Sequence, residues 1–297
     1  LCVRPTSEVL FCDYYKKIIQ SYRDLPKLYN QWCTIVRWEK TTRPFLRSRE
    51  ILWQEGHTMH RTEEEAIEET LRMLHVYEDF QKNVLAIPVI TGKKTEKEKF
   101  AGALATYSLE AMMYDGVALQ NGTSHYFGNG FAQAFGIQFL DQDNKLKAPY
   151  QTSWGVSTRM IGSIIMVHGD DRGLVLPPKI APVKVIMIPI GDDEKVEEVT
   201  LKLADELKDL GISYKIDKTN KTPGFKFAEA EVKGYPIRIE IGKRDLEQNE
   251  VTLVRRDTLE KIKCSLDKVG FMIPTLLDTI QSDLYDKALK RRDSMIY

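Results

Sequence analysis

The sequence contains few cysteines and no long apolar run. Its four cysteines, Cys2, Cys12, Cys33 and Cys264, show no CxxC spacing, so neither a structural zinc site nor a disulfide scaffold is indicated. No apolar stretch approaches the roughly 18 residues that a transmembrane helix needs, and no signal-like segment is visible. We therefore expect a cytoplasmic protein with reduced thiols, no metal site of its own and no contact with a membrane.

An excess of charge of one sign is also missing. The 297 residues include 43 Lys and Arg and 43 Asp and Glu, a balance that gives no overall field to steer a polyanion toward the protein. Any contact with nucleic acid must therefore be local. The sequence has neither a Walker nor a Rossmann phosphate loop, so a phosphate would have to be bound by arginines. The chain begins at Leu1, inside what reads as an element, and we expect its true N-terminus to lie upstream.

A proline-rich connector divides the chain. With 42% hydrophobic residues, a chain of 297 residues can form two domains with separate cores. Pro177, Pro178 and Pro182 lie close together and make a stiff connector that suits neither a helix nor a central strand. We place a first domain at residues 1–178, a second domain at 183–285 and a C-terminal tail at 286–297.

The first domain reads as strands with few helices between them. Thr62 and Glu65 have the spacing of a capping box, and apolar residues follow at helical intervals, so a helix of about five turns is predicted to begin there. Short β-rich runs at 33–39, 117–120 and 161–168 are separated by turn residues. Strands in series indicate an antiparallel sheet.

The second domain alternates strands and helices. A helix is predicted at 194–210, because its apolar residues share one face and Gly211 follows as a stop signal. A last helix is predicted around 276–284. Strands are predicted at 183–190, 212–216, 236–241 and 251–255. The fold class is therefore α+β, with an antiparallel-sheet domain followed by a small α/β domain.

Several polar residues adjoin the apolar runs of the first domain. Arg37 and Glu39 are predicted to project from one face of a strand, so Arg37 either pairs with Glu39 or offers its guanidinium to a carboxylate or phosphate. Arg47 follows in a polar loop, which alone usually marks a solvated face. Residues 120–125 are expected to form a turn after a strand, and a histidine there, His125, is more often structural than catalytic.

These stretches together resemble the motifs of prolyl-tRNA synthetases, class II aminoacyl-tRNA synthetases, of the eukaryotic and archaeal type. The motifs are Arg-Pro-Thr-Ser-Glu at 4–8, Arg-Trp-Glu at 37–39, Pro-Phe-Leu-Arg at 44–47, Trp-Gln-Glu-Gly-His at 53–57, and the segments 97–102, 120–125, 154–162, 173–178 and 242–245. The resemblance covers nearly the whole chain, and motifs in series are more specific than any one of them. The Pro-Thr-Ser-Glu and Trp-x-Glu-x-His elements point to proline, because other class II synthetases share only the arginine features.

The resemblance implies an ATP site. Its residues would be Arg37, Glu39, Arg47, Gln120, Thr123 and Arg159, with Arg37 and Arg159 as the catalytic pair. Phosphoryl displacement mainly requires positioning and charge neutralisation, which fixed guanidinium groups supply without a side-chain nucleophile. Glu39 would orient Arg37 or read the adenine amino group. Mg²⁺ is expected to arrive with ATP rather than at a dedicated protein site.

The resemblance also implies a proline pocket. Its residues would be Thr6, Glu8, Arg37, Trp53, Glu55, His57, Phe100 and His125. Carboxylates and aromatic faces both attract a secondary ammonium, while the proline ring itself buries apolar surface. Two of these residues also have a purely structural interpretation: Thr6 could be a turn residue and Phe100 an aromatic residue of the core.

In the second domain, the resemblance implies an anticodon site at Glu231, Arg238, Arg244 and Asp245. The sequence alone favours a solvated loop at strand ends. Carboxylates accept hydrogen bonds from guanine N1 and N2, and arginines reach O6, N7 or nearby phosphates in an unstacked loop. Acidic and basic residues would therefore both be needed to read guanines.

The implied activity is ATP-dependent conversion of L-proline to prolyl adenylate, followed by transfer of proline to tRNA(Pro). The family's first class II motif would lie upstream of Leu1 and a further module after Tyr297, and the intact protein would be a homodimer. One alternative is another class II synthetase, of the threonyl or glycyl type. A second is a non-catalytic synthetase-like tRNA-binding paralogue, which the presence of Arg37 and Arg159 argues against.

Overall fold

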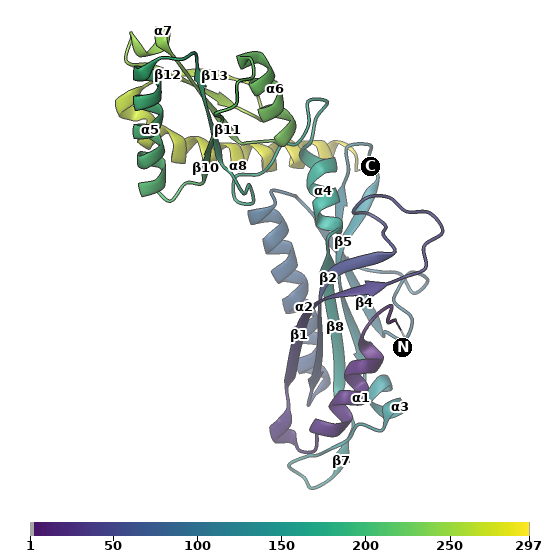
Figure 1. The fold of residues 1–297 in the computed structure, drawn as a ribbon. Coiled ribbons are helices and arrows are strands. Elements are labelled where there is room, and N and C mark those ends of the chain that lie inside the picture. The colour runs from purple at the N-terminus through teal and green to yellow at the C-terminus, as the bar shows by residue number, and fades with distance from the viewer. Residues whose placement is uncertain (1–2, 297) are drawn as a thin grey trace. The chain divides into compact units, whose positions relative to one another are not determined.

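The computed structural model describes residues 3–296, so Cys2 and the two chain ends lie outside the described residues. The chain forms two compact units (Figure 1). Unit 1 comprises Leu1–Gln81 and Val89–Ser163, and unit 2 comprises Lys82–Pro88 and Ile164–Tyr297. Residues 82–88 and 164–178 thus belong to unit 2, although the first domain was expected to extend to residue 178. The domain limits from the sequence remain a prediction.

Unit 1 is built on a six-stranded antiparallel sheet, as the sequence predicted. In spatial order its strands are β1 (Lys27–Val36), β2 (Glu50–His60), β8 (Tyr150–Ser157), β5 (Ala118–Gly128), β4 (Ala105–Met112) and β3 (Ile90–Lys93). β6 (Phe139–Leu140) and β7 (Leu146–Lys147) form a separate small hairpin.

The main helix of unit 1 is α2 (Glu63–Asp79), which packs on β5 and β8 (Figure 1). It begins as predicted, because the Thr62 side chain accepts a hydrogen bond from the Glu65 backbone N–H. A second core lies around α1, where Cys12, Tyr15 and Ile19 are buried at helical spacing. The remaining helical segments are α1 (Glu8–Ile18), α3 (Gly130–Phe135), the 3₁₀ turn η1 (Tyr22–Asp24) and the π-helical turn η2 (Phe80–Val84).

Three local predictions for the first domain were wrong. The run 161–168 is helical, within α4 (Arg159–His168), because a short buried apolar run looks the same as a strand in sequence. Residues 120–125 continue β5 instead of forming a turn, and a register shift opposite Leu109 and Glu110 accommodates them as a bulge. β1 ends at Val36, so residues 37–39 lie beyond the strand.

Unit 2 contains a five-stranded mixed sheet. Its order is β10 (Tyr214–Ile216), β9 (Val185–Ile190), β11 (Ile237–Gly242), β12 (Glu250–Arg255) and β13 (Lys261–Ser265). The first three strands are parallel and the last two pairings are antiparallel. This arrangement confirms a small α/β domain and four predicted strands, while β13 was not predicted.

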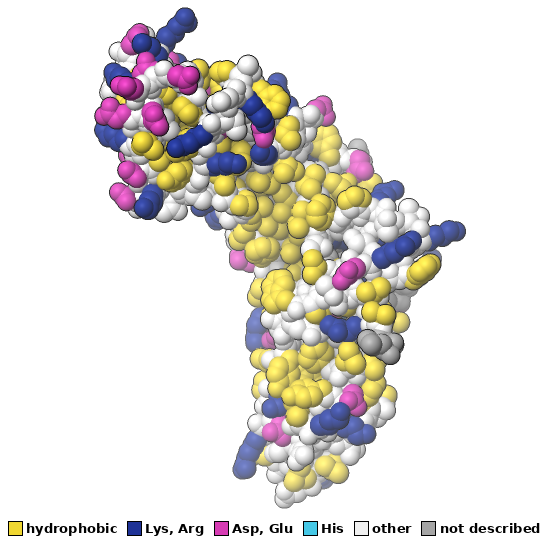
Figure 2. Space-filling model, viewed as in Figure 1, with side chains coloured by type: hydrophobic (Ala, Val, Ile, Leu, Met, Phe, Trp, Pro, Cys, Tyr) yellow, Lys and Arg dark blue, Asp and Glu magenta, His cyan; other side chains and the backbone are white. Residues whose placement is uncertain are grey.

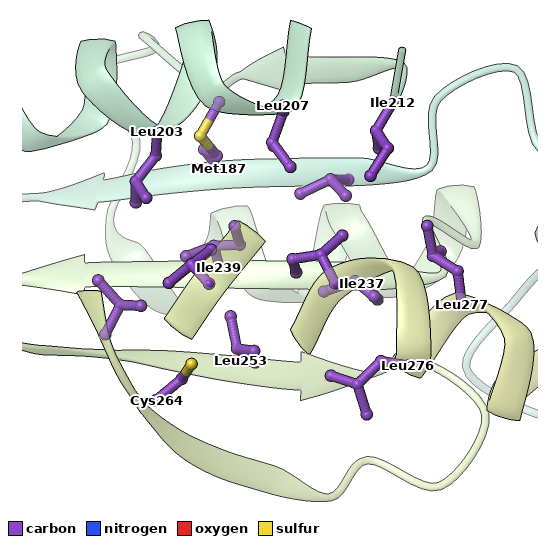
Figure 3. Close-up of a cluster of buried hydrophobic side chains, with 14 of the residues drawn as sticks. Met187, Leu203, Leu207, Ile212, Ile237, Ile239, Leu253, Cys264, Leu276 and Leu277 are labelled. Carbon is purple, nitrogen blue, oxygen red and sulfur yellow. The ribbon is translucent and has the colours of Figure 1, made fainter. Parts of the chain in front are cut away.

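Helices cover both faces of this sheet. The core on one face joins α5 and α8 to the odd-numbered residues of β9 and β11, as Figure 3 shows for Leu203, Leu207, Ile237 and Ile239. On the opposite face α6 packs against Ile186 and Ile188 of β9. The helices of unit 2 are α5 (Glu194–Asp209), α6 (Pro223–Lys233), α7 (Lys243–Leu246), the 3₁₀ turn η3 (Leu266–Lys268) and α8 (Val269–Ser294).

The structure extends two predictions for unit 2. α5 stops where expected, and Gly211 follows it with φ of +68°, a left-handed conformation that glycine adopts without steric cost. The last predicted helix is longer than expected, because α8 continues to Ser294 through most of the segment interpreted as a tail. No helix within residues 3–296 is long and apolar enough to cross a bilayer.

Candidate functional site

A cavity of about 350 Å³ opens on the sheet of unit 1. Its walls come from β2, β5 and β8, from the segment before α1, and from the first residue of α4. Eleven residues predicted from the sequence line it, namely Thr6, Glu8, Arg37, Trp53, Glu55, His57, Phe100, Gln120, Thr123, His125 and Arg159. Residues that lie up to about 150 positions apart in the chain are therefore gathered in one site.

Two arginines in the cavity are fixed by backbone carbonyls. The Arg159 guanidinium donates from Nε to Leu46 O at 3.1 Å and from Nη1 to Gln120 O at 3.2 Å. Arg37 donates from Nε to Pro5 O at 3.1 Å, and its guanidinium carbon lies 5.5 Å from the Trp53 ring centroid. Both side chains keep further N–H donors for a ligand.

The cavity carries a concentration of positive charge. Burial lowers the pKa of Arg159, and repulsion from Arg47 and Arg37 lowers it further. Such mutual repulsion between guanidinium groups is relieved when an anion binds between them. This end of the cavity therefore suits a polyphosphate.

Glu39 and Arg47 are not among the residues that line the cavity. They form an ion pair of 3.2 Å with each other, and the Arg49 Nε donates to the Glu39 carbonyl. From the sequence, one interpretation of Arg37 was an ion pair with Glu39. In the structure the Glu39 carboxylate contacts Arg47 instead. The reason is that Arg37 and Glu39 lie beyond the end of β1, where side chains no longer alternate as in a strand.

Glu55 and His57 form a buried pair in the wall of the cavity. Their side chains are 3% and 1% exposed, and His57 Nε2 lies 3.0 Å from Glu55 Oε2. The other oxygen, Oε1, accepts hydrogen bonds from Ser7 and from Gln31. Burial alone would raise the pKa of Glu55, but the hydrogen bonds from His57, Ser7 and Gln31 outweigh it, and the pKa is lowered. Glu55 is therefore ionised but already well provided with donors.

A second carboxylate, that of Glu8, also lines the cavity. Glu8 accepts a short hydrogen bond from Thr6 and another from Ser153 at 3.2 Å, and it is 5% exposed. Thr6 thus supports Glu8 and is not merely a turn residue. Two carboxylates and the Trp53 ring, which Arg37 also contacts, give the cavity the negative and aromatic groups that attract an ammonium.

Phe100 and His125 meet with their ring centroids 4.9 Å apart. His125 Nδ1 lies 3.0 Å from the Thr106 hydroxyl, and burial together with repulsion from Lys94 and His57 lowers the pKa of His125 to about 4. His125 is therefore neutral at pH 7. Phe100 is partly exposed at the cavity wall, which differs from the alternative that placed it in a core.

Gln120 shares the cavity face of β5 with Thr123 because of the bulge in that strand. The register pairs Glu110 with Gln120 and Leu109 with Gly122, so Asn121 is the additional residue. Asn121 turns to the far side, where its amide donates to Gln81 at 2.9 Å. Gln120 accepts a short hydrogen bond from Lys94.

Trp154 forms part of the cavity wall and lies across Gly56. The register pairs these two residues directly, and a Cβ added to Gly56 would come within 2.1 Å of the Trp154 ring. Gly56 is the residue that allows the indole to approach the backbone of β2. Trp154 also meets the Tyr77 ring of α2 edge to face, at 6.4 Å between centroids.

In unit 2, the structure brings Glu231 and Arg238 together. Arg238 is 6% exposed and its Nη1 donates to Glu231 at 3.2 Å, while Nε and Nη2 donate to Glu240 at 3.1 and 2.9 Å. The guanidinium also lies 4.5 Å from the Phe227 ring centroid. Residues 225–231 belong to α6, so the expected loop is a helix.

Alternation along β11 explains this grouping. Ile237, Ile239 and Ile241 point into the core, so Arg238 and Glu240 must face the other side, where α6 supplies Glu231 and Phe227. Burial raises the pKa of Glu231, but the hydrogen bonds from Arg172 and Arg238 lower it by more, so the pKa is below its ordinary value. Glu231 is therefore ionised and has two arginine partners.

The other two predicted anticodon residues lie in α7. Asp245 accepts from the Thr252 hydroxyl at 2.9 Å and forms a close ion pair with Lys263. Arg244 precedes it in the same short helix. Around α5 and α7, Figure 2 shows basic and acidic side chains interspersed, as the balanced composition requires.

Several residues of both sites were not predicted. Lys94, Thr106, Ser153 and Trp154 line the cavity, and Glu240 and Lys261 join the cluster around Arg238. The Ile-Arg-Ile-Glu-Ile alternation at 237–241 was a usable signal for Glu240. Within residues 3–296, no three His, Cys, Asp or Glu side chains are grouped so that they could hold a metal ion.

Comparisons with known proteins agree with this geometry. The family profile described as the tRNA synthetase class II core domain (G, H, P, S and T) matches residues 1–168, and the anticodon binding domain profile matches residues 184–275. The proline--tRNA ligases of Lachnospira eligens and Ruminiclostridium cellulolyticum are both 60% identical to this chain. Each alignment covers 100% of this chain and 62% of the relative.

A solved structure is similar over almost the same range. The prolyl-tRNA synthetase of Cryptosporidium parvum, complexed with L-proline and AMP, aligns with a TM-score of 0.95 and 44% identity over 98% of this chain and 61% of that chain. The chain thus spans about three fifths of the length of the relatives it matches. Because the class II core profile alone matches more than half of its residues, the chain belongs to the class II tRNA synthetase core family (G, H, P, S and T), and the relatives named above are proline--tRNA ligases.

Proposed function

We propose that the protein containing this chain activates L-proline with ATP, releases pyrophosphate and transfers proline to tRNA(Pro). The observation that carries this proposal is one cavity lined by both cationic and anionic side chains. Arg37 and Arg159 line it together with Glu8 and Glu55. A nucleotide phosphate and the ammonium of an amino acid can therefore enter the same cavity with opposite charges matched.

The proposed ATP site consists of Arg37, Arg159, Gln120 and Thr123, with Glu39 and Arg47 as an adjoining ion pair. Arg37 and Arg159 would neutralise charge that develops on the phosphoryl group, and their anchoring to carbonyls means that little reorganisation is needed. Mg²⁺ would enter with ATP, whose phosphate oxygens suit its preference for hard ligands.

The proposed proline site is bounded by Thr6, Glu8, Trp53, Glu55, His57, Phe100 and His125. Glu8 and the Glu55–His57 pair would bind the secondary ammonium, and the Trp53 and Phe100 rings would contact the proline ring. In unit 2, the proposed anticodon residues are Glu231, Arg238, Arg244 and Asp245. We further propose that the whole protein is a cytoplasmic homodimer.

Amino-acid-dependent exchange of pyrophosphate into ATP tests the proposal directly. The full-length protein containing this chain should exchange with proline and not with threonine, glycine, serine or histidine, the other amino acids of the matching core family. Exchange driven best by another of these amino acids would identify a different class II enzyme. No exchange, with tRNA binding retained, would indicate a non-catalytic paralogue.

A further inference from the structure

Strand β1 contributes a layer of side chains beside the amino-acid end of the cavity. Gln31 and Cys33 lie on one face of β1, and the register pairs them directly with Glu55 and Trp53 of β2. Trp53 donates from Nε1 to Cys33 Sγ at 3.3 Å, and Gln31 donates to Glu55. Glu55 and Trp53 line the cavity, so β1 supports two of its walls.

Gln31 joins Glu55 to Ser7. Its Nε2 lies 2.6 Å from Glu55 Oε1 and 3.1 Å from Ser7 Oγ, and the Ser7 hydroxyl itself donates to Glu55 Oε1. A buried carboxylate stays ionised only when donors replace the lost water. The pKa of Glu55 is lowered despite its burial, because His57, Ser7 and Gln31 together supply such donors.

An ionised Glu55 determines which nitrogen of His57 carries a proton. Glu55 Oε2 can only accept, so His57 Nε2, at 3.0 Å, must be the donor. The Phe11 ring stacks on the imidazole at 4.4 Å and 18°, which fixes the ring plane. His57 Nδ1 is buried and has no hydrogen-bond partner within the described residues. A buried polar atom without a partner is costly, and a polar ligand group that forms a hydrogen bond with it would relieve that cost.

We propose that Gln31 is a positioning residue for the amino-acid pocket, because it holds Glu55 in the orientation that sets the donor and acceptor roles of His57. This inference rests on the proposed function, since it assigns the amine of the amino acid to the Glu55–His57 end. Gln31 acts through Glu55 and does not touch the substrate. Ser7 has the same role on the other side of Glu55 Oε1.

Two substitutions of Gln31 separate positioning from simple packing. Gln31→Leu removes one donor to an ionised carboxylate and should raise the KM for proline by about tenfold at every pH. Gln31→Glu places a second carboxyl group beside Glu55, and two adjacent carboxylates resist ionising together. At low pH the two carboxyl groups share a proton, so the new group can still donate to Glu55. As pH rises this proton is lost, and the two carboxylates repel each other, which displaces Glu55. The KM for proline of this variant should therefore increase from pH 6.5 to pH 8.5 by a further factor of about ten.

The measurement is proline-dependent pyrophosphate exchange by the full-length protein, with proline and ATP varied separately. The KM for ATP should stay within about twofold of the wild-type value, because the arginine end of the cavity is unchanged. Thr34→Val is the matched control, since Thr34 is exposed on the opposite face of the same strand. If a Gln31 variant does not fold, Ser7→Ala removes another donor to the same oxygen, to which the Cys33 thiol also donates at 3.7 Å.

The outcomes distinguish the inference from the function on which it rests. Wild-type protein without proline-dependent exchange contradicts the proposed function. Wild-type exchange with an unchanged proline KM in both Gln31 variants contradicts the positioning role. An equal rise in the KM values for ATP and proline, with no additional pH dependence in Gln31→Glu, would mean that Gln31 only stabilises the fold, and it would also overturn the inference.

Discussion

Replacing Arg159 with alanine should remove most of the proposed adenylate-forming activity without unfolding the protein. Arg159 donates to the carbonyls of Leu46 and Gln120, so its remaining N–H groups are held in place before ATP arrives. Loss of one preorganised donor to developing charge typically costs a factor of about 10²–10³ in rate, or about 3–4 kcal/mol. We expect a decrease of that size in kcat/KM for ATP in proline-dependent pyrophosphate exchange.

The folded state should tolerate this change. Burial and repulsion from Arg47 and Arg37 lower the pKa of Arg159, so the cation is not a source of folding stability in the absence of an anion. The urea midpoint of Arg159→Ala should therefore match that of wild type, whereas the rise in melting temperature caused by ATP should be lost. Arg23→Ala, at an exposed arginine of η1, serves as control. Exchange within about threefold of wild type would refute the role of Arg159.

Three further predictions test the remaining assignments. Glu55→Gln should raise the KM for proline far more than that for ATP, and equal effects on both would make Glu55 structural. Arg244→Glu or Glu231→Arg should raise the tRNA concentration needed for aminoacylation while exchange without tRNA is unchanged, and parallel losses would contradict an anticodon role. His168 is buried, which lowers its pKa to about 4 from 6.5, so the stability that it contributes is present above pH 6.5 and lost as pH falls toward 4. His168 should account for a fall in the free energy of unfolding of up to about 1.4 kcal/mol per pH unit in that window, in addition to the falls due to the buried His60 and His125, whose pKa values are also lowered to about 4. Urea titrations should show a shallower fall for His168→Gln but not for the exposed control His75→Gln, and equal slopes would exclude His168 as a source.

Local signals in the sequence predicted many of the elements. The helix after Thr62 and the stop at Gly211 were predictable because a capping side chain and a left-handed glycine act within a few residues. The run 161–168 was misread because its Ile and Val residues favour strands, whereas tertiary packing made it a helix. The helix Glu8–Ile18 was not predicted, although Cys12, Tyr15 and Ile19 show its buried face.

The candidate site also depends on contacts that local sequence patterns cannot predict. Motifs named eleven of the residues that line the cavity, because each motif is contiguous in sequence. Partners such as Gln31 and Ser7 of Glu55 could not be named, since cross-strand contacts depend on a register in which a slip of one residue reverses every side chain. The bulge at Asn121, which aims Gln120 at the cavity, is equally invisible without the paired strand.

The contact between Gly56 and Trp154 couples substitutions at two positions that lie far apart in the sequence. Alanine at position 56 alone would place its Cβ inside the Trp154 ring, so either the backbone of β2 or the indole would have to shift. Once residue 154 is smaller, the same alanine fits. The indole packs against Tyr77 of α2, so the order in which the two substitutions arise decides whether the intermediate variant strains β2 or only loses a contact between the sheet and α2.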